Sequence, residues 1–436
     1  MWPNWKRPLP GPVFKFGKIR FNRIFSCKGQ VRTVQVSLAS IREAAACIKD
    51  DIHHTPLSYS RTFSELSGNM VYLKAENLQK TGSFKIRGAL NKIKNLTEAE
   101  KEKGVIAISA GNHAQGVALA ATTAGISSTI VMPENAPIAK VVATRGYGAR
   151  VELFGNCFDD CASKARELQA ETGATFIHPF DDPYVIAGQG TIGLEIMADL
   201  AEVEVVLVPV GGGGLIAGTA IALKEMNPAI EVIGVEAEGA ASMKASLQQG
   251  KITTLASVKT LADGIAVKTP GRLTFEIAQK YVDAVVTVNE EEIANGILML
   301  LERGKLIVEG AGATPIAALL NNKLPLKGKR VVALLSGGNI DVNILAQIIE
   351  RGLVKAGRRI KIITYLEDKP GQLYQLLGLL AQLGANIINI YHHREKMGIE
   401  LGIAEVELDL ETRDAEHSRL IINFLTEKGY RTRYLE

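Results

Sequence analysis

From residue 70 to residue 345, short apolar runs alternate with stretches of helical periodicity, and this alternation constrains the fold more than any other feature of the chain. The expected strands cover residues 71–74, 104–108, 128–132, 150–153, 205–210, 231–235, 284–288 and 330–335. The expected helices cover residues 115–124, 137–147, 159–172, 214–227, 290–303 and 315–321. Such alternation is typical of βαβ units, so we predict an α/β region with a mainly parallel sheet and helices on both faces.

Composition limits the kind of protein that this chain can be. Its 436 residues predict two or three domains, and 47% apolar with 22% charged residues is typical of a globular protein. The formal charge of +4 is unevenly distributed, because residues 1–33 carry eight Lys or Arg and no acid, which leaves −4 on the remainder. A mildly acidic body argues against a nucleic-acid-binding protein.

The basic first segment, residues 1–36, contains four prolines and no apolar run long enough for a secretory signal. We expect a disordered extension there, with the folded chain beginning at residue 37. The four cysteines, Cys27, Cys47, Cys157 and Cys161, form no disulfide framework and no zinc-ligand pattern, so we predict no metal site. No run approaches the ~18 apolar residues of a membrane span, and we expect a cytoplasmic protein with reduced cysteines.

The segment 80–89 reads Lys-Thr-Gly-Ser-Phe-Lys-Ile-Arg-Gly-Ala and leads from the expected strand 71–74 into an expected helix over 88–94. Lys85 therefore lies near the N-terminus of the expected helix, where unpaired N–H groups and a partial positive charge favour loss of the amine proton. A neutral lysine is the nucleophile that forms a Schiff base. The alternative is a solvated surface charge, as for most lysines.

Three polar or glycine-rich motifs follow expected strands, at the carboxyl ends where parallel sheets bind ligands. The first comprises Ser109, Ala110, Gly111, Asn112 and His113, which could hold a carboxylate on backbone N–H groups or form an ordinary turn. The second comprises Gly211, Gly212, Gly213, Gly214 and Leu215. Four glycines cost conformational entropy that a plain turn does not require, so we predict a nest of donors around a phosphate. The third places the Ser336 hydroxyl at the end of the sheet.

The second motif also has an alternative interpretation. Gly212-x-Gly214-x-x-Ala217 fits the looser dinucleotide fingerprint, and Glu236 follows the next expected strand, where a ribose-binding acid belongs. On that motif alone the chain could be a nicotinamide-dependent dehydrogenase. That interpretation leaves the segment around Lys85 and the segment 336–339 unexplained.

Taken together and in chain order, these motifs resemble the tryptophan-synthase-β-like (fold type II) pyridoxal-phosphate enzymes, and within them the threonine/serine dehydratases. The resemblance covers roughly residues 37–350. It rests on the segments 77–85, 109–115, 186–191, 211–215 and 336–339. It implies a two-lobed catalytic domain with parallel sheets and pyridoxal 5′-phosphate as the cofactor.

The resemblance also implies roles for single residues. The lysine that matches Lys85 carries the cofactor as a Schiff base, and the phenylalanine that matches Phe84 lies beside the cofactor ring. Asn112 matches the residue that bonds the ring oxygen, and Ser336 matches the partner of the pyridine nitrogen. The residues that match 211–215 hold the phosphate, and those that match 109–113 hold the substrate carboxylate.

The implied chemistry is elimination of the β-hydroxyl from L-threonine, and from L-serine, to give a 2-oxo acid and ammonia. A serine at the pyridine nitrogen gives a weaker electron sink than a carboxylate does, which favours elimination over transamination. Lys85, once freed by the substrate amine, is expected to take the Cα proton. Serine racemases carry a serine where this chain has Ala110, so we expect weak racemisation. A catalytically inactive amino-acid sensor is a further alternative.

The pattern of the sequence changes after residue 352, where the region that resembles the catalytic domain ends. We expect a linker over 353–358 and a regulatory domain over 359–436, in which strands and helices follow the order βαββαβ of a ferredoxin-like fold. With its Asp-Lys-Pro-Gly-Gln-Leu segment this domain resembles an ACT domain, a family of amino-acid-sensing modules. The expected effector-binding residues are Asp368, Pro370, Gly371, Gln372, Leu373 and Asn386. The resemblance implies a branched-chain amino acid as effector and a homo-oligomer, either a dimer or a tetramer; the domain could instead serve only in dimerisation.

Overall fold

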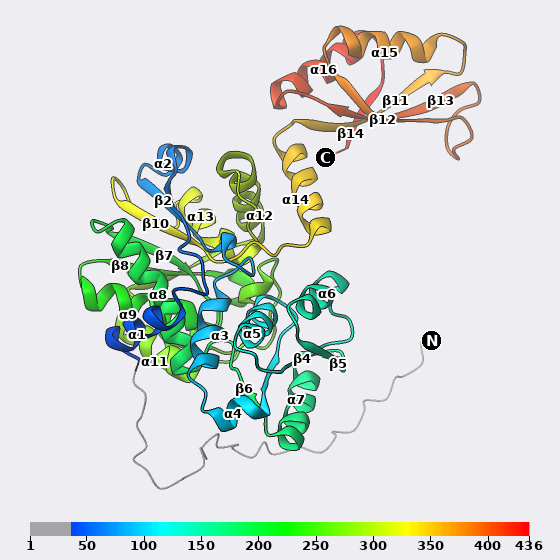
Figure 1. Cartoon of the computed structure of the whole chain (residues 1–436). Coiled ribbons are helices and arrows are strands. Elements are labelled where there is room, and N and C mark those ends of the chain that lie inside the picture. The colour runs from blue at the N-terminus through cyan, green and yellow to red at the C-terminus, as the bar shows by residue number, and fades with distance from the viewer. Residues whose placement is uncertain (1–35, 436) are drawn as a thin grey trace, which may run out of the picture. The chain divides into compact units, whose positions relative to one another are not determined.

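The computed structural model describes residues 36–435, so the extension expected over 1–36 lies outside the described residues except for Val36. Within this range the chain forms two parallel-sheet lobes, followed by a C-terminal domain with an antiparallel sheet (Figure 1). The α/β architecture and the parallel sheets predicted from the sequence are confirmed.

The larger lobe is a six-stranded sheet with the order β1-β2-β10-β7-β8-β9, in which only the edge pair β1–β2 is antiparallel. Its strands are β1 (Leu57–Tyr59), β2 (Met70–Ala75), β7 (Val205–Pro209), β8 (Glu231–Ala237), β9 (Ala284–Val288) and β10 (Arg330–Leu335). The helices that accompany these strands in the chain are α1 (Leu38–Ile48), α2 (Arg61–Ser67), α8 (Pro183–Asp199), α9 (Gly214–Met226), α10 (Ser242–Gln249), α11 (Arg272–Tyr281), α12 (Glu290–Met299), α13 (Gly310–Leu320) and α14 (Val342–Lys355).

The smaller lobe is a parallel sheet with the order β5-β4-β3-β6. Its strands are β3 (Val105–Ile108), β4 (Ser128–Met132), β5 (Arg150–Leu153) and β6 (Thr175–Phe176). Its helices are α3 (Lys85–Lys94), α4 (Glu98–Lys103), α5 (Asn112–Thr123), α6 (Ile138–Gly146) and α7 (Phe158–Thr172). Helix α3 packs against both α5 and α8, so it joins this lobe to the larger one.

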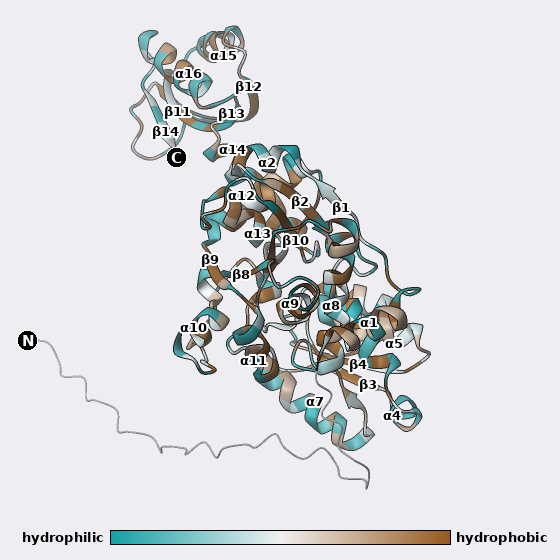
Figure 2. Ribbon diagram, turned by 90° about the vertical axis from the view of Figure 1, so that its left-hand side faces the viewer, coloured by the Kyte–Doolittle hydropathy of each residue, from teal (hydrophilic) through white to brown (hydrophobic). Residues whose placement is uncertain are grey.

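The central strands are apolar along their whole length because both of their faces are covered. Every residue of β7 is buried, and so is every residue of β10 after Arg330. Strands β2, β10, β3 and β4 are hydrophobic, whereas the outer helices α4 and α7 are largely hydrophilic (Figure 2). This is the pattern of a parallel sheet between layers of helices.

Several helices begin earlier than the sequence predicted. Helix α3 begins at Lys85 instead of residue 88, α5 at Asn112 instead of 115, and α13 at Gly310 instead of 315. The missed turns of α5 and α13 contain Asn, His, Gly or Thr, which have weak helix propensity by themselves, whereas the missed turn of α3, Lys-Ile-Arg, closely follows the turn-forming Gly-Ser pair. Burial of these turns against other elements overrides that propensity. The consequence is that Lys85 and Asn112 are the first residues of helices.

A buried ion-pair network surrounds Arg87 in the first turn of α3. The guanidinium of Arg87 donates to both oxygens of Glu76 at 2.8 Å and to both oxygens of Glu195 at 2.6 and 3.0 Å. The ammonium of Lys74 lies 2.7 Å from Glu195. Buried charges need such partners, since a charge without one is very unfavourable in the interior. The network therefore ties α3 to β2 and α8, two residues from Lys85.

The C-terminal domain has the predicted ferredoxin-like order. Its elements are β11 (Arg359–Glu367), α15 (Gln372–Gln382), β12 (Asn386–His393), β13 (Ile403–Glu411), α16 (Ala415–Glu427) and β14 (Thr432–Leu435), and the sheet order is β12-β13-β11-β14. One side packs α15 and α16 on an apolar core that includes Ile362, Leu376 and Leu408. Residues 353–355, expected to be linker, are instead the last turn of α14, because the amphipathic pattern of that helix continues to Lys355. The domain boundaries themselves stay predictions.

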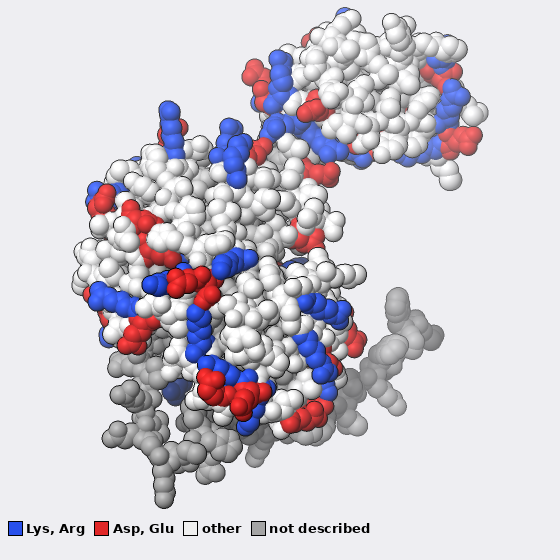
Figure 3. All heavy atoms as spheres, in the orientation of Figure 1, with Lys and Arg blue, Asp and Glu red and all other residues white. Residues whose placement is uncertain are grey.

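Charged side chains of both signs are interspersed over most of the face drawn in Figure 3. Among the helices of residues 36–435, none is long and apolar enough to cross a membrane.

Candidate active site

Lys85 occupies the position that the sequence predicted to be reactive. Its ammonium donates a 3.0 Å hydrogen bond to the Pro179 carbonyl and lies 5.0 Å from the centre of the Phe84 ring. Burial of the amine lowers the pKa of Lys85 to about 8, and the nearby Glu309 carboxylate opposes this shift. A substantial fraction of Lys85 is therefore neutral near physiological pH, which is the state that attacks a carbonyl group.

The segments around Lys85 and Ser336 lie side by side. Ser83 and Gly337 form an antiparallel bridge, and the N–H of Phe84 donates to the Ser336 carbonyl at 3.1 Å. Ser336 is buried directly after β10. The structure thus brings together two motifs that are about 250 residues apart in the sequence.

The glycine run joins β7 to α9. No backbone N–H of residues 211–215 donates to another backbone group within residues 36–435, although these residues are buried. Gly213 has a φ of +95°, which only glycine adopts without strain. A side chain on Gly212 would overlap the Phe180 ring, with an added Cβ only 2.3 Å from it. The glycines therefore allow the Phe180 ring to pack closely, and they also leave buried N–H donors without a backbone acceptor.

The motif 109–113 is divided between a loop and a helix. The Ser109 hydroxyl accepts a 3.1 Å hydrogen bond from the N–H of Gly111, and a Cβ on Gly111 would meet open space. Asn112 begins α5. The His113 ring is buried and bonded to the Ile177 carbonyl at 2.9 Å, and burial lowers its pKa to about 3. The His113 side chain is thus neutral and hydrogen-bonded to Ile177, so only the backbone of His113 can face a substrate.

Glu309, which the sequence analysis did not single out, lies in the same place. Both of its carboxylate oxygens accept from the Asn112 amide nitrogen, at 2.7 and 2.9 Å. Glu309 is 4% exposed, and burial raises its pKa to about 7. The signal in the sequence was weak: an acid followed by Gly-Ala-Gly at a helix start.

A second missed element is the segment 177–182, which contacts Lys85, the His113 ring and the glycine run. The Pro179 carbonyl holds the Lys85 ammonium, and the Phe180 ring packs on Gly212. The Asp181 carboxylate accepts from three backbone N–H groups of α11 at 2.9 to 3.2 Å. The sequence His-Pro-Phe-Asp-Asp before a helix is a recognisable signal of capping chemistry.

Comparison with known proteins adds to this geometry. The family profile described as "Pyridoxal-phosphate dependent enzyme" matches residues 48–337. The chain belongs to this family. An L-threonine ammonia-lyase of Thermotoga maritima is 56% identical over 398 residues, which cover 91% of this chain and 99% of that protein. Residues 1–352 number fewer than 398, so the similarity extends into the C-terminal domain.

Two solved structures have the fold of the two lobes. The processed form of threonine deaminase isoform 2 from Solanum lycopersicum is 41% identical with a TM-score of 0.70, over 74% of this chain and 94% of that chain. Maize serine racemase is 38% identical with a TM-score of 0.70, over 73% of this chain and 98% of that chain. The predicted fold type II architecture and pyridoxal-phosphate cofactor are thereby confirmed.

The residues present fit the cofactor of this pyridoxal-phosphate enzyme. A phosphate needs several converging N–H donors, and residues 211–215 offer buried ones that no backbone acceptor uses. The cofactor aldehyde needs a neutral amine, which Lys85 supplies. These donors and the amine lie at the carboxyl ends of strands, where ligands bind in such sheets.

The dinucleotide interpretation of Glu236 does not hold. Both Glu236 oxygens face the start of α10, where they accept from the N–H groups of Met243 and Lys244 at 2.8 and 2.9 Å. The carboxylate is buried, and burial raises its pKa to about 7. Glu236 therefore caps a helix and does not present a ribose-binding acid.

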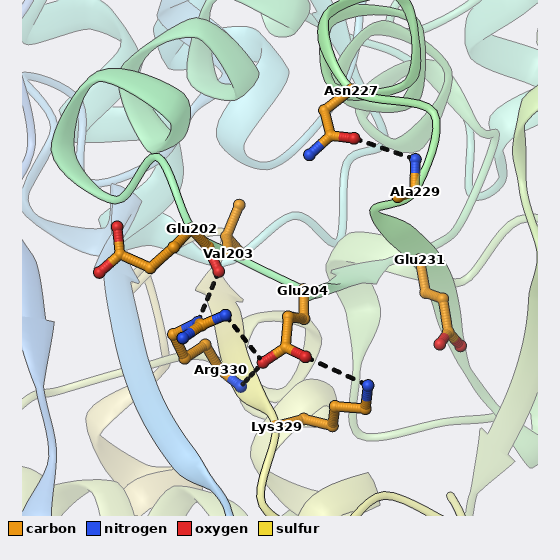
Figure 4. A pocket seen from close by; sticks show the side chains of 8 residues that line it. All are labelled: Glu202, Val203, Glu204, Asn227, Ala229, Glu231, Lys329 and Arg330. Carbon is orange, nitrogen blue, oxygen red and sulfur yellow. Dashed lines mark hydrogen bonds and ion pairs between the residues drawn. The ribbon is translucent and has the colours of Figure 1, made fainter.

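A surface pocket of about 350 Å³ lies at the opposite, amino ends of β7, β8 and β10 (Figure 4). Three of its charged residues pair with one another, since Glu204 accepts from the Lys329 ammonium at 3.1 Å and from the Arg330 N–H at 3.0 Å. It is separate from the motifs predicted to bind ligands.

The predicted effector residues do not all meet within one chain. Residues 368–373 follow the carboxyl end of β11, and Asp368 pairs with Arg394 at 3.0 Å. Asn386 begins β12 opposite Glu411, which pairs with Arg359 at the start of β11. The two groups lie at opposite ends of the sheet, roughly 25 Å apart for a strand of this length. Because β11 and β12 run in the same direction, Asn386 and the loop do not meet within one chain, and the predicted effector site stays a prediction.

Proposed function

We propose that this pyridoxal-phosphate enzyme is a threonine ammonia-lyase, which converts L-threonine to 2-oxobutanoate and ammonia, and L-serine to pyruvate and ammonia. The observation that carries the proposal is a partly neutral Lys85 at the start of α3, whose amine bonds the Pro179 carbonyl, while the neighbouring Phe180 packs on the glycine run with the open donors of residues 211–215. The identity of 56% to an L-threonine ammonia-lyase supports the choice of substrate.

The proposed mechanism uses residues of this chain for each protein-dependent task. Bound pyridoxal phosphate supplies a carbonyl that condenses with the substrate amine and withdraws electrons from Cα. The N–H groups of residues 109–113 hold the substrate carboxylate, with Asn112 also directed to the ring oxygen. Lys85, released by the substrate, removes the Cα proton.

Elimination then follows from the electron flow. The Cα–H electron pair forms the Cα–Cβ double bond and the Cβ–O bond breaks. The hydroxyl gains one proton and leaves as water, which balances the proton that Lys85 takes from Cα. The unsaturated amino acid is hydrolysed to the 2-oxo acid and ammonia. The Ser336 hydroxyl cannot stabilise a full positive charge on the pyridine nitrogen as a carboxylate would, and this favours elimination over transamination.

Racemisation is the second candidate activity, favoured by the likeness to maize serine racemase. A racemase needs an acid or base on each face of Cα. The half-buried methyl group of Ala110 offers no proton, so racemisation should be slow compared with elimination.

Regulation and assembly belong to the same proposal. We propose that the C-terminal domain is an ACT domain that senses a branched-chain amino acid through residues 368–373, at the start of α15. We further propose a homo-oligomer, and a cytoplasmic location that suits free thiols such as those of Cys47, Cys157 and Cys161.

The test is an assay of the purified full chain with pyridoxal phosphate. We expect 2-oxobutanoate and ammonia from L-threonine in equal amounts, and much less D-serine than pyruvate from L-serine. Isoleucine and valine should change the threonine saturation curve. Absence of 2-oxobutanoate from a preparation that binds the cofactor would refute the assignment, and D-serine in excess of pyruvate would favour the racemase.

A further inference from the structure

A chain of side-chain hydrogen bonds runs across the site from the segment that precedes Lys85. The Asn339 amide nitrogen donates to the Thr81 carbonyl at 2.8 Å and to the Asn112 amide oxygen at 2.7 Å. The Asn112 amide nitrogen in turn donates to both Glu309 oxygens. Four segments that are distant in the sequence therefore meet through two amides and one carboxylate.

The polarity of this chain of hydrogen bonds is fixed from its Thr81 end. The Thr81 carbonyl can only accept, so the nitrogen of Asn339 must face it. The same nitrogen of Asn339 also faces Asn112, so Asn112 accepts through its amide oxygen and turns its amide nitrogen toward Glu309. Rotating the Asn112 amide by half a turn would set its oxygen against the carboxylate and its nitrogen against the NH₂ group of Asn339. Both contacts would be repulsive.

The surrounding backbone leaves room for these side chains. A Cβ on Gly337 would lie 2.5 Å from a Glu309 oxygen, and one on Gly82 would lie 2.5 Å from the Asn339 amide oxygen. Gly82 also has a φ of +69°, the left-handed region that favours glycine. Two glycines thus stand where a Cβ would collide with Glu309 or with Asn339, which indicates that the placement of these side chains is specific.

We propose that Glu309 is a positioning residue, which holds the Asn112 amide so that its second N–H faces the ring oxygen of the cofactor. This inference rests on the proposed function. Asn112 is half-buried whereas Glu309 is buried, so the open side of the amide is the one away from Glu309. An amide nitrogen has two hydrogens, and the carboxylate uses one side of it.

The consequence concerns the bound cofactor itself. A fixed N–H donor stabilises a negatively charged ring oxygen more than a freely rotating amide does, because no reorganisation is needed. Loss of the restraint should weaken cofactor binding and increase the share of cofactor with a protonated ring oxygen. These two forms absorb at different wavelengths, so their ratio is measurable without turnover.

The experiment compares Glu309→Leu with Glu309→Gln in the full chain, using pyridoxal phosphate as the probe. The leucine variant removes the acceptor, and we expect the dissociation constant of the cofactor to rise roughly tenfold or more, with a shift toward the short-wavelength band. Glutamine can still accept through its oxygen, so it should restore most of both properties. Glu405→Gln, at a buried carboxylate of the C-terminal domain, is the control and should change neither.

A double-mutant cycle tests whether Glu309 acts through Asn112. In an Asn112→Ala background, Glu309→Leu should add less than about twofold to the dissociation constant, since the amide that it positions is gone. A full additional effect would overturn the proposal. Equal dissociation constants and band ratios in wild type and Glu309→Leu, while wild type still dehydrates threonine, would also overturn it.

Two further outcomes are distinguishable. If Glu309→Leu does not fold, Asn339→Leu removes the other restraint on the same amide and must produce the same shift of the bands, or the proposal fails. If wild type binds pyridoxal phosphate but does not act on threonine, the proposed function fails while the band ratio still decides the role of Glu309.

Discussion

At the residue scale, the reactivity of Lys85 arises from its surroundings. A lysine in water has a pKa near 10.4, whereas burial at the start of α3 lowers that of Lys85 to about 8. Glu309 limits this shift by attracting the ammonium form. The pair therefore sets the pH range in which the amine is available to the cofactor.

Replacing Lys85 by alanine should remove both the covalent attachment and the Cα base. We expect 2-oxobutanoate formation to fall by roughly 10²–10⁴-fold or more, and the visible absorbance of attached cofactor to vanish. Lys80→Ala is the matched control, because Lys80 is exposed in the same segment and should leave both unchanged. Undiminished turnover in Lys85→Ala would contradict the assignment.

The pKa of Lys85 predicts how pH affects cofactor attachment to the cofactor-free enzyme. Only the neutral amine attacks the aldehyde, so the rate should rise about tenfold per pH unit below pH 7 and level off above about pH 8. Stopped-flow absorbance measures this rate directly. A rate that still rises steeply up to pH 10 would mean that the amine has the pKa of an ordinary exposed lysine.

At the scale of elements, close helix packing and one sharp turn shape the site. Helices α3 and α8 touch through glycines, since a Cβ on Gly188 would lie 2.6 Å from the Arg87 carbonyl. The segment 186–191 thus contributes packing rather than ligand contacts. The joint between β7 and α9 is a turn of a different kind, because Gly213 needs a positive φ and has no free space around it.

Gly213→Ala tests that joint. An added Cβ would lie 2.6 Å from the end of the Met243 side chain and 2.8 Å from Thr274, and the backbone would be strained as well. We expect a loss of about 2–4 kcal/mol in the free energy of unfolding and weaker cofactor binding. Gly250→Ala is the matched comparison, because Gly250 has a φ of +65° and open space around it. Only backbone strain should act there, and we expect the free energy of unfolding to fall by about 1 kcal/mol. Equal losses in the two variants would show that packing around Gly213 is unimportant.

At the scale of the whole molecule, two lobes and a C-terminal domain with an antiparallel sheet share one chain. Maize serine racemase matches over 98% of its own length but only 73% of this chain, so the two lobes also occur without such a C-terminal domain. This supports our proposal that the lobes carry out catalysis and that the domain after α14 serves in regulation.

A chain ending at Arg358, which keeps α14 whole, should test that separation. We expect it to bind cofactor and dehydrate threonine, but to lose the response to isoleucine or valine. In the full chain, effector coupling of the usual size would change threonine affinity about 5- to 150-fold. Threonine saturation curves of both chains, with and without effector, provide the measurement. A truncated chain that responds like the full one would place the effector site in the lobes.

The sequence by itself determined the fold class, the position of Lys85 and the order of the strand-end motifs. Strand periodicity and glycine runs are local signals, so they can be recognised without knowledge of the tertiary contacts. The βαββαβ order of the last domain was predictable for the same reason.

Only the tertiary structure decided how these motifs are completed. Glu309, Asn339 and the segment 177–182 reach the site through contacts between residues that are far apart in the sequence, and no local pattern encodes such contacts. The separation of Asn386 from the loop 368–373 within one chain was hidden for a related reason: order along the chain does not reveal at which end of a sheet a residue lies. The parallel direction of β11 and β12 sets that, and it depends on the strand β13 between them.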